Sequence, residues 1–321
     1  MAVSLIKKQE LSAESVKLIV DDLSKFLQLG STVLVGKHEQ LKMAWCCILA
    51  GGHLLVEDLP GMGKTTMVKT MARLLNMPWK RIQCTNDMLP ADITGGSVYD
   101  EATKTFKFIA GPIFTNLVMA DELNRASPKS QSAFLQAMEE TSVTVDGQTY
   151  QLPTPFVVIA TQNSLDSAGT NPLPESQLDR FMMSLSLGLP ARDIERQLLM
   201  QRPSAELLDA LPSMMTVSKL SQMRDLVSLV HVGENVADYL LDLANWLRSR
   251  SHGLSPRTVL ALTSASKAWA ISSGRDFVTP SDVQAVALSV LNHRLTPKDN
   301  FQSMSGKALI VTALQTVEVN G

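Results

Sequence analysis

Residues 58–66 read Asp-Leu-Pro-Gly-Met-Gly-Lys-Thr-Thr, and they directly follow the apolar run Leu54-Leu55-Val56. A strand that leads through a glycine-containing loop into a helix beginning Gly-Lys-Thr is the pattern of a phosphate-binding P-loop. The backbone N–H groups of such a loop converge on an anion, and the dipole of the following helix adds about half a positive charge. The stretch therefore predicts a nucleotide site on an α/β fold with a parallel sheet.

Two side chains of this loop have predicted roles. Lys64 is expected to reach the β- and γ-phosphates, and the hydroxyl of Thr65 is expected to bind Mg²⁺. The pattern normally begins with glycine, and Asp58 stands in that place. The loop residues predicted to contact the nucleotide are Pro60, Gly61, Met62, Gly63, Lys64, Thr65 and Thr66.

A second apolar run, residues 117–120, ends in Asp121 and Glu122. Such a strand places its carboxylates at the C-terminal edge of a parallel sheet, where α/β proteins bind ligands. Asp121 is predicted to hold Mg²⁺ directly or through water, and Glu122 to orient and deprotonate an attacking water. Taken alone, the run also fits a strand that ends in a solvated acidic turn. The P-loop upstream favours the catalytic interpretation.

A third apolar run, residues 156–161, ends in Gln162 and Asn163. An asparagine at the tip of a neighbouring strand can hydrogen-bond the γ-phosphate or the attacking water, and we expect this role for Asn163. The alternative is a simple turn, because asparagine is common after strands.

The composition indicates a compact protein. Its 321 residues suffice for two domains, and 45% of them are apolar and 19% charged. The net charge of −2 and the pI of about 6.2 provide no field that would attract nucleic acid. The longest apolar stretch, residues 43–56, is interrupted by Gly51-Gly52-His53 and is too short to span a bilayer, so we expect no membrane insertion.

The N-terminus and the cysteines predict the cellular compartment. Residues 1–10 lack the apolar run of a signal peptide. Cys46, Cys47 and Cys84 have neither metal-binding spacing nor the even number of a disulfide framework. Both features predict a reducing, cytoplasmic setting.

The alternation of strands and helices ends near residues 189–190, and helical patterns follow from residue 191. We therefore predict two domains: residues 1–190 with N-terminal helices and an α/β P-loop core, and residues 191–321 with a smaller all-helical domain. Two hairpins are predicted within the core. One covers residues 97–109, where two β-like runs flank a polar tip, and the other covers residues 143–150, where Asp-Gly marks the turn.

Together these features resemble the AAA+ ATPases and, in finer detail, the MoxR family. The resemblance covers nearly the full length, from about residue 33 to about residue 295. Each matching stretch is weak alone, but their combination is specific. The stretches are Leu89-Pro-Ala-Asp-Ile-Thr-Gly95, Gly111-Pro-Ile-Phe114, Ala120-Asp-Glu-Leu-Asn-Arg-Ala126, Pro172-Leu-Pro-Glu175, Asp179-Arg-Phe181, Ser255-Pro-Arg257 and Val278-Thr-Pro-Ser-Asp282.

The resemblance implies roles for four further residues. Gly36 and Lys37 match the segment that touches the adenine in this family. Arg180 matches an arginine finger, which acts on the nucleotide of a neighbouring subunit, and Arg257 matches the sensor arginine of a lid helix. Independently, Pro256 predicts a helix start, where the helix dipole disfavours positive charge, so an external anion is expected to hold Arg257.

The resemblance also interprets the two hairpins and leaves one arginine open. Residues 93–110 match the insert in the second helix that marks this branch of AAA+ proteins, and residues 143–150 match the hairpin before the sensor strand. Arg125 either lines a subunit interface or pairs with Glu139 or Glu140.

The function that the resemblance implies is that of an ATP-hydrolysing homo-oligomer, a hexameric ring. Its motion would remodel, mature or activate client protein complexes in a chaperone-like way, in some cases with a von Willebrand factor A domain partner. A magnesium-chelatase-type motor subunit is the main alternative. A nucleic-acid motor is less favoured, because the chain is mildly acidic and lacks a basic aromatic patch. The Gly-Ala-Phe-Thr-Gly-Ala loop of enhancer-binding activators is absent.

Overall fold

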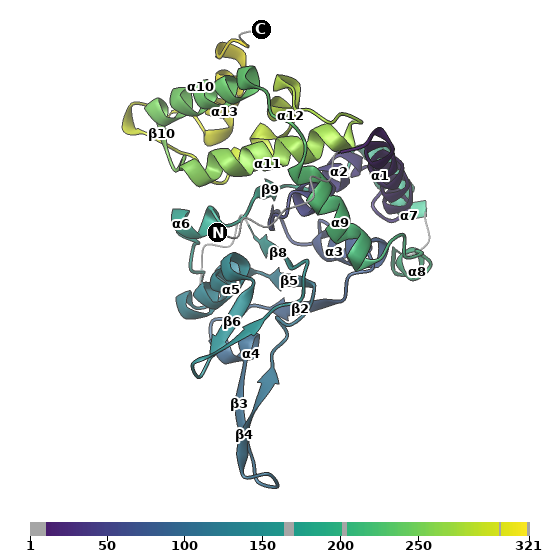
Figure 1. The fold of residues 1–321 in the computed structure, drawn as a ribbon, viewed down its shortest axis with the longest axis vertical. Helices are drawn as coiled ribbons and strands as arrows, with labels where there is room; N and C mark the ends of the chain where they lie inside the picture. The colour runs from purple at the N-terminus through teal and green to yellow at the C-terminus, as the bar shows by residue number, and fades with distance from the viewer. Residues whose placement is uncertain (1–10, 164–169, 201–203, 302, 320–321) are drawn as a thin grey trace, which may run out of the picture.

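A computed structural model describes residues 11–163, 170–200, 204–301 and 303–319. The N-terminal stretch from which the lack of a signal peptide was predicted lies outside these ranges. The described chain forms a parallel sheet with helices on both faces, and a helical region lies beyond it (Figure 1). This arrangement confirms the predicted fold class.

The central sheet has five parallel strands in the order β2-β5-β8-β1-β9. These strands are β1 (Leu54–Glu57), β2 (Trp79–Gln83), β5 (Leu117–Asp121), β8 (Val157–Gln162) and β9 (Met183–Leu185). The middle strands β5, β8 and β1 are almost wholly buried, as expected for a parallel sheet covered on both faces. Strand β9 was not predicted, because three residues are too few to show a periodic pattern.

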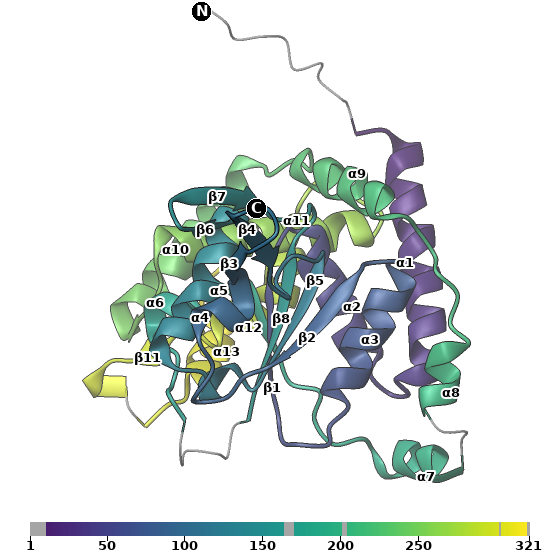
Figure 2. The ribbon, with the colours of Figure 1, turned by 90° about the horizontal axis from the view of Figure 1, so that it is seen from below.

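Side chains alternate between the two faces of the sheet with the period of two that strands impose. Leu54 and Val56 belong to the core beneath one set of helices, whereas Leu55 between them belongs to a second core. The first set is α1 (Ala13–Val33), α2 (His38–Leu49) and α3 (Lys64–Leu74), and the second is α4 (Pro90–Thr94) and α5 (Pro128–Glu140). Figure 2 shows the two sets on opposite sides of the strands.

The chain beyond residue 190 is helical, as predicted. It forms α7 (Arg192–Met200), α8 (Ser204–Asp209), α9 (Val217–Ser228), α10 (Glu234–Arg250), α11 (Pro256–Ser272), α12 (Pro280–Leu291) and α13 (Gly306–Thr316). A short antiparallel ladder joins β10 (Ser251–His252) to β11 (Thr296–Pro297) and was not predicted. Helix α8 packs against α1 and α3, so part of this region lies on the α/β core.

Both predicted hairpins are present. The first joins β3 (Gly95–Asp100) to β4 (Thr105–Ala110) and extends away from the body (Figure 1). Its base requires glycine, since Gly95 has a φ of +83° and an added Cβ would lie 2.0 Å from the carbonyl oxygen of Ile109. The second joins β6 (Ser142–Val145) to β7 (Gln148–Gln151) through an Asp-Gly turn with positive φ at both residues.

Shorter elements connect the main ones. They are α6 (Glu175–Leu178), the 3₁₀ turn η1 (Leu123–Arg125) and the 3₁₀ turn η2 (Asp299–Phe301). No helix within the described ranges combines the length and the apolar character needed to cross a membrane.

Candidate functional site at the C-terminal edge of the sheet

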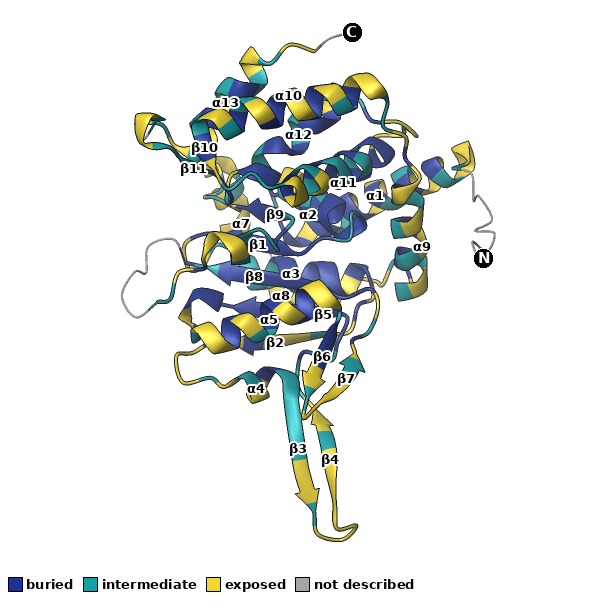
Figure 3. Ribbon diagram, turned by 60° about the vertical axis from the view of Figure 1, so that its left-hand side comes forward, coloured by how far each residue is buried: buried dark blue, intermediate teal, exposed yellow. Residues whose placement is uncertain are grey.

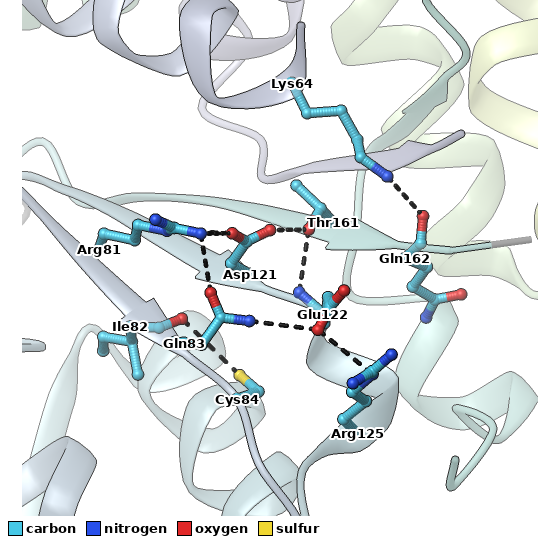
Figure 4. Close-up of polar contacts among 10 residues, drawn as sticks. All are labelled: Lys64, Arg81, Ile82, Gln83, Cys84, Asp121, Glu122, Arg125, Thr161 and Gln162. Carbon is cyan, nitrogen blue, oxygen red and sulfur yellow. Dashed lines mark hydrogen bonds and ion pairs between the residues drawn. The ribbon is translucent and has the colours of Figure 1, made fainter. Parts of the chain in front are cut away.

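Three of the predicted site segments meet at one edge of the sheet. Strands β1, β5 and β8 are parallel neighbours, so their carboxyl ends lie side by side. The P-loop follows β1, Asp121 and Glu122 stand at the end of β5, and Asn163 follows β8. Figure 4 shows Lys64, Asp121 and Glu122 around the ends of these strands, with the amine of Lys64 directed to Gln162. Such an edge is where α/β proteins bind ligands.

The P-loop backbone is shaped by two glycines. Gly61 has a φ of +80° and Gly63, the N-cap of α3, has a φ of +87°. An added Cβ at Gly61 would meet nothing within 4 Å. The need for glycine there is therefore conformational rather than steric, because side-chain-bearing residues rarely adopt these angles. The turn leaves the first N–H groups of α3 available to an anion.

Lys64 links the beginning of the P-loop to β8. Its Nζ donates to the carbonyl oxygens of Asp58, at 2.7 Å, and Gln162, at 3.2 Å. Burial lowers the pKa of Lys64, and the nearby carboxylates of Asp58, Asp121 and Glu122 oppose that shift. These carboxylates favour a charged amine beside the loop.

Thr161 organises the two acidic residues. Its hydroxyl donates to Asp121 Oδ1 at 2.6 Å and accepts from the backbone N–H of Glu122 at 2.9 Å. Thr161 is fully buried, so both contacts are protected from water. Sequence reasoning missed this residue, since a threonine in an apolar strand has no distinctive pattern.

Arg81, which was also not predicted, forms an ion pair with Asp121. Its guanidinium contacts Asp121 Oδ2 through Nη2 at 2.5 Å and through Nε at 3.0 Å (Figure 4). The contact arises because β2 is the direct neighbour of β5 in the sheet. The available signal in the sequence was the presence of three polar residues, Lys80, Arg81 and Gln83, in the segment that forms β2.

Glu122 adopts a left-handed backbone conformation, with a φ of +57°. That conformation is uncommon for a residue with a side chain and indicates local strain at the end of β5. The carboxylate accepts from Gln83 Nε2 at 3.2 Å and pairs with Arg125 Nε at 3.2 Å. The prediction that Arg125 pairs with Glu139 or Glu140 is wrong, because the turn η1 brings Arg125 back to Glu122.

The remaining predicted residues lie around this edge. Asn163 is buried at the end of β8. Thr65 and Thr66 stand in the first turn of α3. Lys37 turns its amine to the carbonyl oxygens of Leu187 and Gly188.

Comparisons with known proteins identify the family. A model described as the ATPase family associated with various cellular activities (AAA) matches residues 53–183, and an AAA lid domain model matches residues 248–313. Chaperone MoxR1 of Mycobacterium tuberculosis is 32% identical over 326 residues, covering 95% of this chain and 84% of that protein. The chain belongs to the MoxR family of AAA+ ATPases.

Other similar proteins agree with this membership. An uncharacterized Bacillus subtilis protein, YeaC, is 40% identical over 304 residues, covering 92% of this chain and 94% of its own. The crystal structure of a proposed ATPase from Cytophaga hutchinsonii matches with a TM-score of 0.87 and 30% identity, over 96% of this chain and 98% of that chain. ATP hydrolysis is thereby supported at the level of the MoxR family.

Two arginines of this MoxR-family chain lie away from the P-loop. Residues 179–182 directly precede β9, and the N–H of Met182 donates to the carbonyl oxygen of His53, the residue before β1. Because β1 and β9 are parallel, Arg180 stands at the N-terminal edge of the sheet. Lys64 follows β1 and stands at the opposite edge. The structure therefore does not bring Arg180 to the P-loop of its own chain.

Arg180 and Arg257 share one carboxylate on α5. Arg180 Nη2 lies 3.0 Å from Glu139 Oε2, and Arg257 Nη2 lies 2.5 Å from Glu139 Oε1. Arg257 is at the start of α11, as Pro256 predicted, and Ser255 caps that helix by accepting from the N–H of Thr258. The anion that holds Arg257 here is a carboxylate of the same chain, and the hydrogen bond from Arg257 lowers the pKa of Glu139.

Proposed function

We propose that this MoxR-family chain hydrolyses ATP with Mg²⁺ in a homo-oligomer, most simply a hexameric ring, and uses the resulting motion to remodel or activate client proteins. The observation that carries the proposal is the gathering of Lys64, Asp121 and Glu122 at one edge of the sheet beside the P-loop. The opposite edge carries two arginines.

The residues present fit ATP and Mg²⁺. The N–H groups at Gly61, Gly63 and the start of α3 suit phosphate oxygens, and Lys64 adds a positive charge. Thr65 and Asp121 supply the oxygen ligands that Mg²⁺ prefers, and the bound ion would neutralise charge on the phosphates. Glu122 would orient and deprotonate the attacking water, and Asn163 would hydrogen-bond that water or the γ-phosphate.

The two arginines argue for hydrolysis between subunits. Arg180 stands across the sheet from Lys64, and Glu139 holds Arg257 beside it. A side chain at that edge cannot reach the P-loop of its own chain. In a ring, both arginines would face the nucleotide of the next copy, where they would stabilise the negative charge of the transition state.

The motion that we propose is between residues 1–190 and the helical region 191–321. This motion would act on client proteins or on a partner with a von Willebrand factor A domain, as the family resemblance implies. We place the protein in the cytoplasm because Cys46, Cys47 and Cys84 are free and buried. Burial raises the pKa of each thiol to about 12, so the thiols stay protonated and unreactive.

Removal of Lys64 tests nucleotide binding. Lys64→Ala is expected to weaken binding of a fluorescent ATP analogue roughly 10- to 100-fold, because a hydrogen bond to a charged group is lost. Phosphate release should fall to background, as it should for the wild type in EDTA. Lys129→Ala, which changes an exposed lysine on α5, serves as the control. Equal binding by Lys64→Ala and wild type would contradict the nucleotide site.

The β3–β4 hairpin is a candidate contact for clients. Val98, Tyr99, Phe106 and Ile109 on it are between 51% and 72% exposed in the single chain (Figure 3). Apolar groups in such a cluster commonly mark an interaction surface. Phe108 instead stacks on Tyr150 of β7 with ring centroids 4.0 Å apart, so this side chain of the hairpin packs on its own domain. We propose that the four exposed side chains contact the client or partner.

Shortening the tip of this hairpin separates the two roles. Deletion within residues 101–105 is expected to leave basal hydrolysis and ring assembly intact, and to abolish stimulation of hydrolysis by a permanently unfolded model protein. Phosphate release and light scattering measure these properties. A shortened protein that fails to assemble, or that loses basal turnover, would show that the hairpin is structural.

A further inference from the structure

The segment between β9 and α7 is held from two sides by oppositely charged side chains. Asp58 Oδ2 accepts from the N–H groups of Leu187, at 2.5 Å, and Gly188, at 2.9 Å, and from Ser186 Oγ at 3.2 Å. Lys37 Nζ donates to the carbonyl oxygens of the same Leu187 and Gly188, at 2.5 and 2.7 Å. Asp58 and Lys37 therefore hold this segment through the peptide groups of Leu187 and Gly188. We call this set of hydrogen bonds the clamp.

Burial makes this clamp costly to open. Asp58 is 7% exposed and Lys37 is 9% exposed. A buried charge is stable only where hydrogen bonds replace its lost water, and bonds to charged groups are the stronger kind. Each side chain meets this need with the peptide groups of Leu187 and Gly188. Displacing that segment would leave both charges without these bonds.

Asp58 also touches the group expected to bind phosphate. Its carbonyl oxygen accepts from Lys64 Nζ at 2.7 Å, and its N–H donates to the carbonyl of Gln162 at 3.3 Å. Its backbone thus belongs to the P-loop, while its carboxylate belongs to the clamp. On the far side of the clamp, an added Cβ at Gly36 would lie 3.0 Å from Ile194 of α7, so the turn before α2 lies directly against that helix.

We propose that Asp58 and Lys37 are positioning residues that couple the P-loop to the segment leading into the helical region. The inference rests on the proposed function, because the coupled event is nucleotide binding at Lys64. When Lys64 turns to a phosphate, the backbone carbonyl of Asp58 loses its donor. Residue 58 is then less firmly fixed, and its carboxylate holds Leu187 and Gly188 less tightly. The helical region thereby becomes free to move when the nucleotide binds.

This role explains why aspartate occupies a place where the P-loop pattern has glycine. Glycine at residue 58 would keep the loop but would leave the N–H groups of Leu187 and Gly188 without their acceptor. The carboxylate serves the segment between β9 and α7 rather than the phosphate site. Asp58→Gly therefore removes the coupling while bringing the loop closer to the usual pattern.

Hydrogen exchange of the full-length protein tests the inference, read by mass spectrometry over residues 186–200. In the wild type, a non-hydrolysable ATP analogue with Mg²⁺ should raise exchange at Leu187 and Gly188. In Asp58→Gly these amides should exchange at least ~10-fold faster without nucleotide, since each loses a bond to a charged acceptor. They should then no longer respond to the analogue, although the variant still binds it. Asp146→Asn, in the exposed β6–β7 turn, is the control.

The results for the variants and for the wild type show whether Asp58 couples nucleotide binding to residues 186–188. Wild-type exchange and response in Asp58→Gly, or loss of analogue binding by this variant, would overturn the coupling. If Asp58→Gly does not fold, Asp58→Asn can replace it, because asparagine keeps the side-chain volume of aspartate. Asp58→Asn should show the same changes in exchange with smaller magnitude. Wild-type exchange and response in Asp58→Asn would also overturn the coupling. A wild type that binds no analogue contradicts the proposed function itself, whereas one that binds it with unchanged exchange contradicts only the coupling.

Discussion

Glu122→Gln is expected to bind ATP with wild-type affinity and to hydrolyse it at least ~10²-fold more slowly, which is the usual size of a lost general base. Glutamine keeps the shape of the side chain but cannot take a proton from water. The carboxylate stands at the end of β5 in a left-handed conformation, with Gln83 and Arg125 within 3.2 Å. These contacts hold the carboxylate in place at the end of β5.

Two measurements separate binding from chemistry in this variant. Equilibrium titration with a fluorescent ATP analogue gives affinity, and phosphate release gives turnover. Glu140→Gln makes the same chemical change at an exposed position near the end of α5 and should behave as wild type. Wild-type turnover in Glu122→Gln would contradict the assignment of Glu122 as the catalytic base.

Arg180→Ala is expected to reduce turnover by ~10³-fold or more, the size reported for arginines that act on a neighbouring active site. Folding should not suffer, because the Arg180 side chain is 28% exposed and pairs with a carboxylate that Arg257 also holds. Arg192→Ala, on the exposed face of α7, is the matched control.

Mixing of inactive subunits tests whether Arg180 acts between chains. Arg180→Ala combined with Lys64→Ala creates interfaces that join an intact arginine to an intact P-loop, so activity should return in the mixture. Specific activity of the wild type should also rise with protein concentration near the assembly constant. Specific activity that stays flat down to concentrations where light scattering detects only monomer would refute action between subunits.

Local sequence patterns were sufficient to predict many of the structural elements and several of the candidate site residues. The P-loop, the acidic end of β5 and both hairpins were predicted from short stretches, because turn geometry and strand periodicity depend on neighbouring residues. The helical character of the chain beyond residue 190 was predicted for the same reason. The family resemblance pointed to Arg180 and Arg257, and their roles stay predictions.

Only the tertiary structure shows which side chains contact the acidic residues of the site. Arg81 meets Asp121 because β2 lies beside β5, Thr161 joins Asp121 to Glu122 because β8 lies on the other side, and Asp58 holds Leu187 across 129 residues of chain. A period-two pattern states which face a side chain takes, but not which strand becomes its neighbour. Strand order places Arg180 across the sheet from Lys64 for the same physical reason, and no local pattern contains that order.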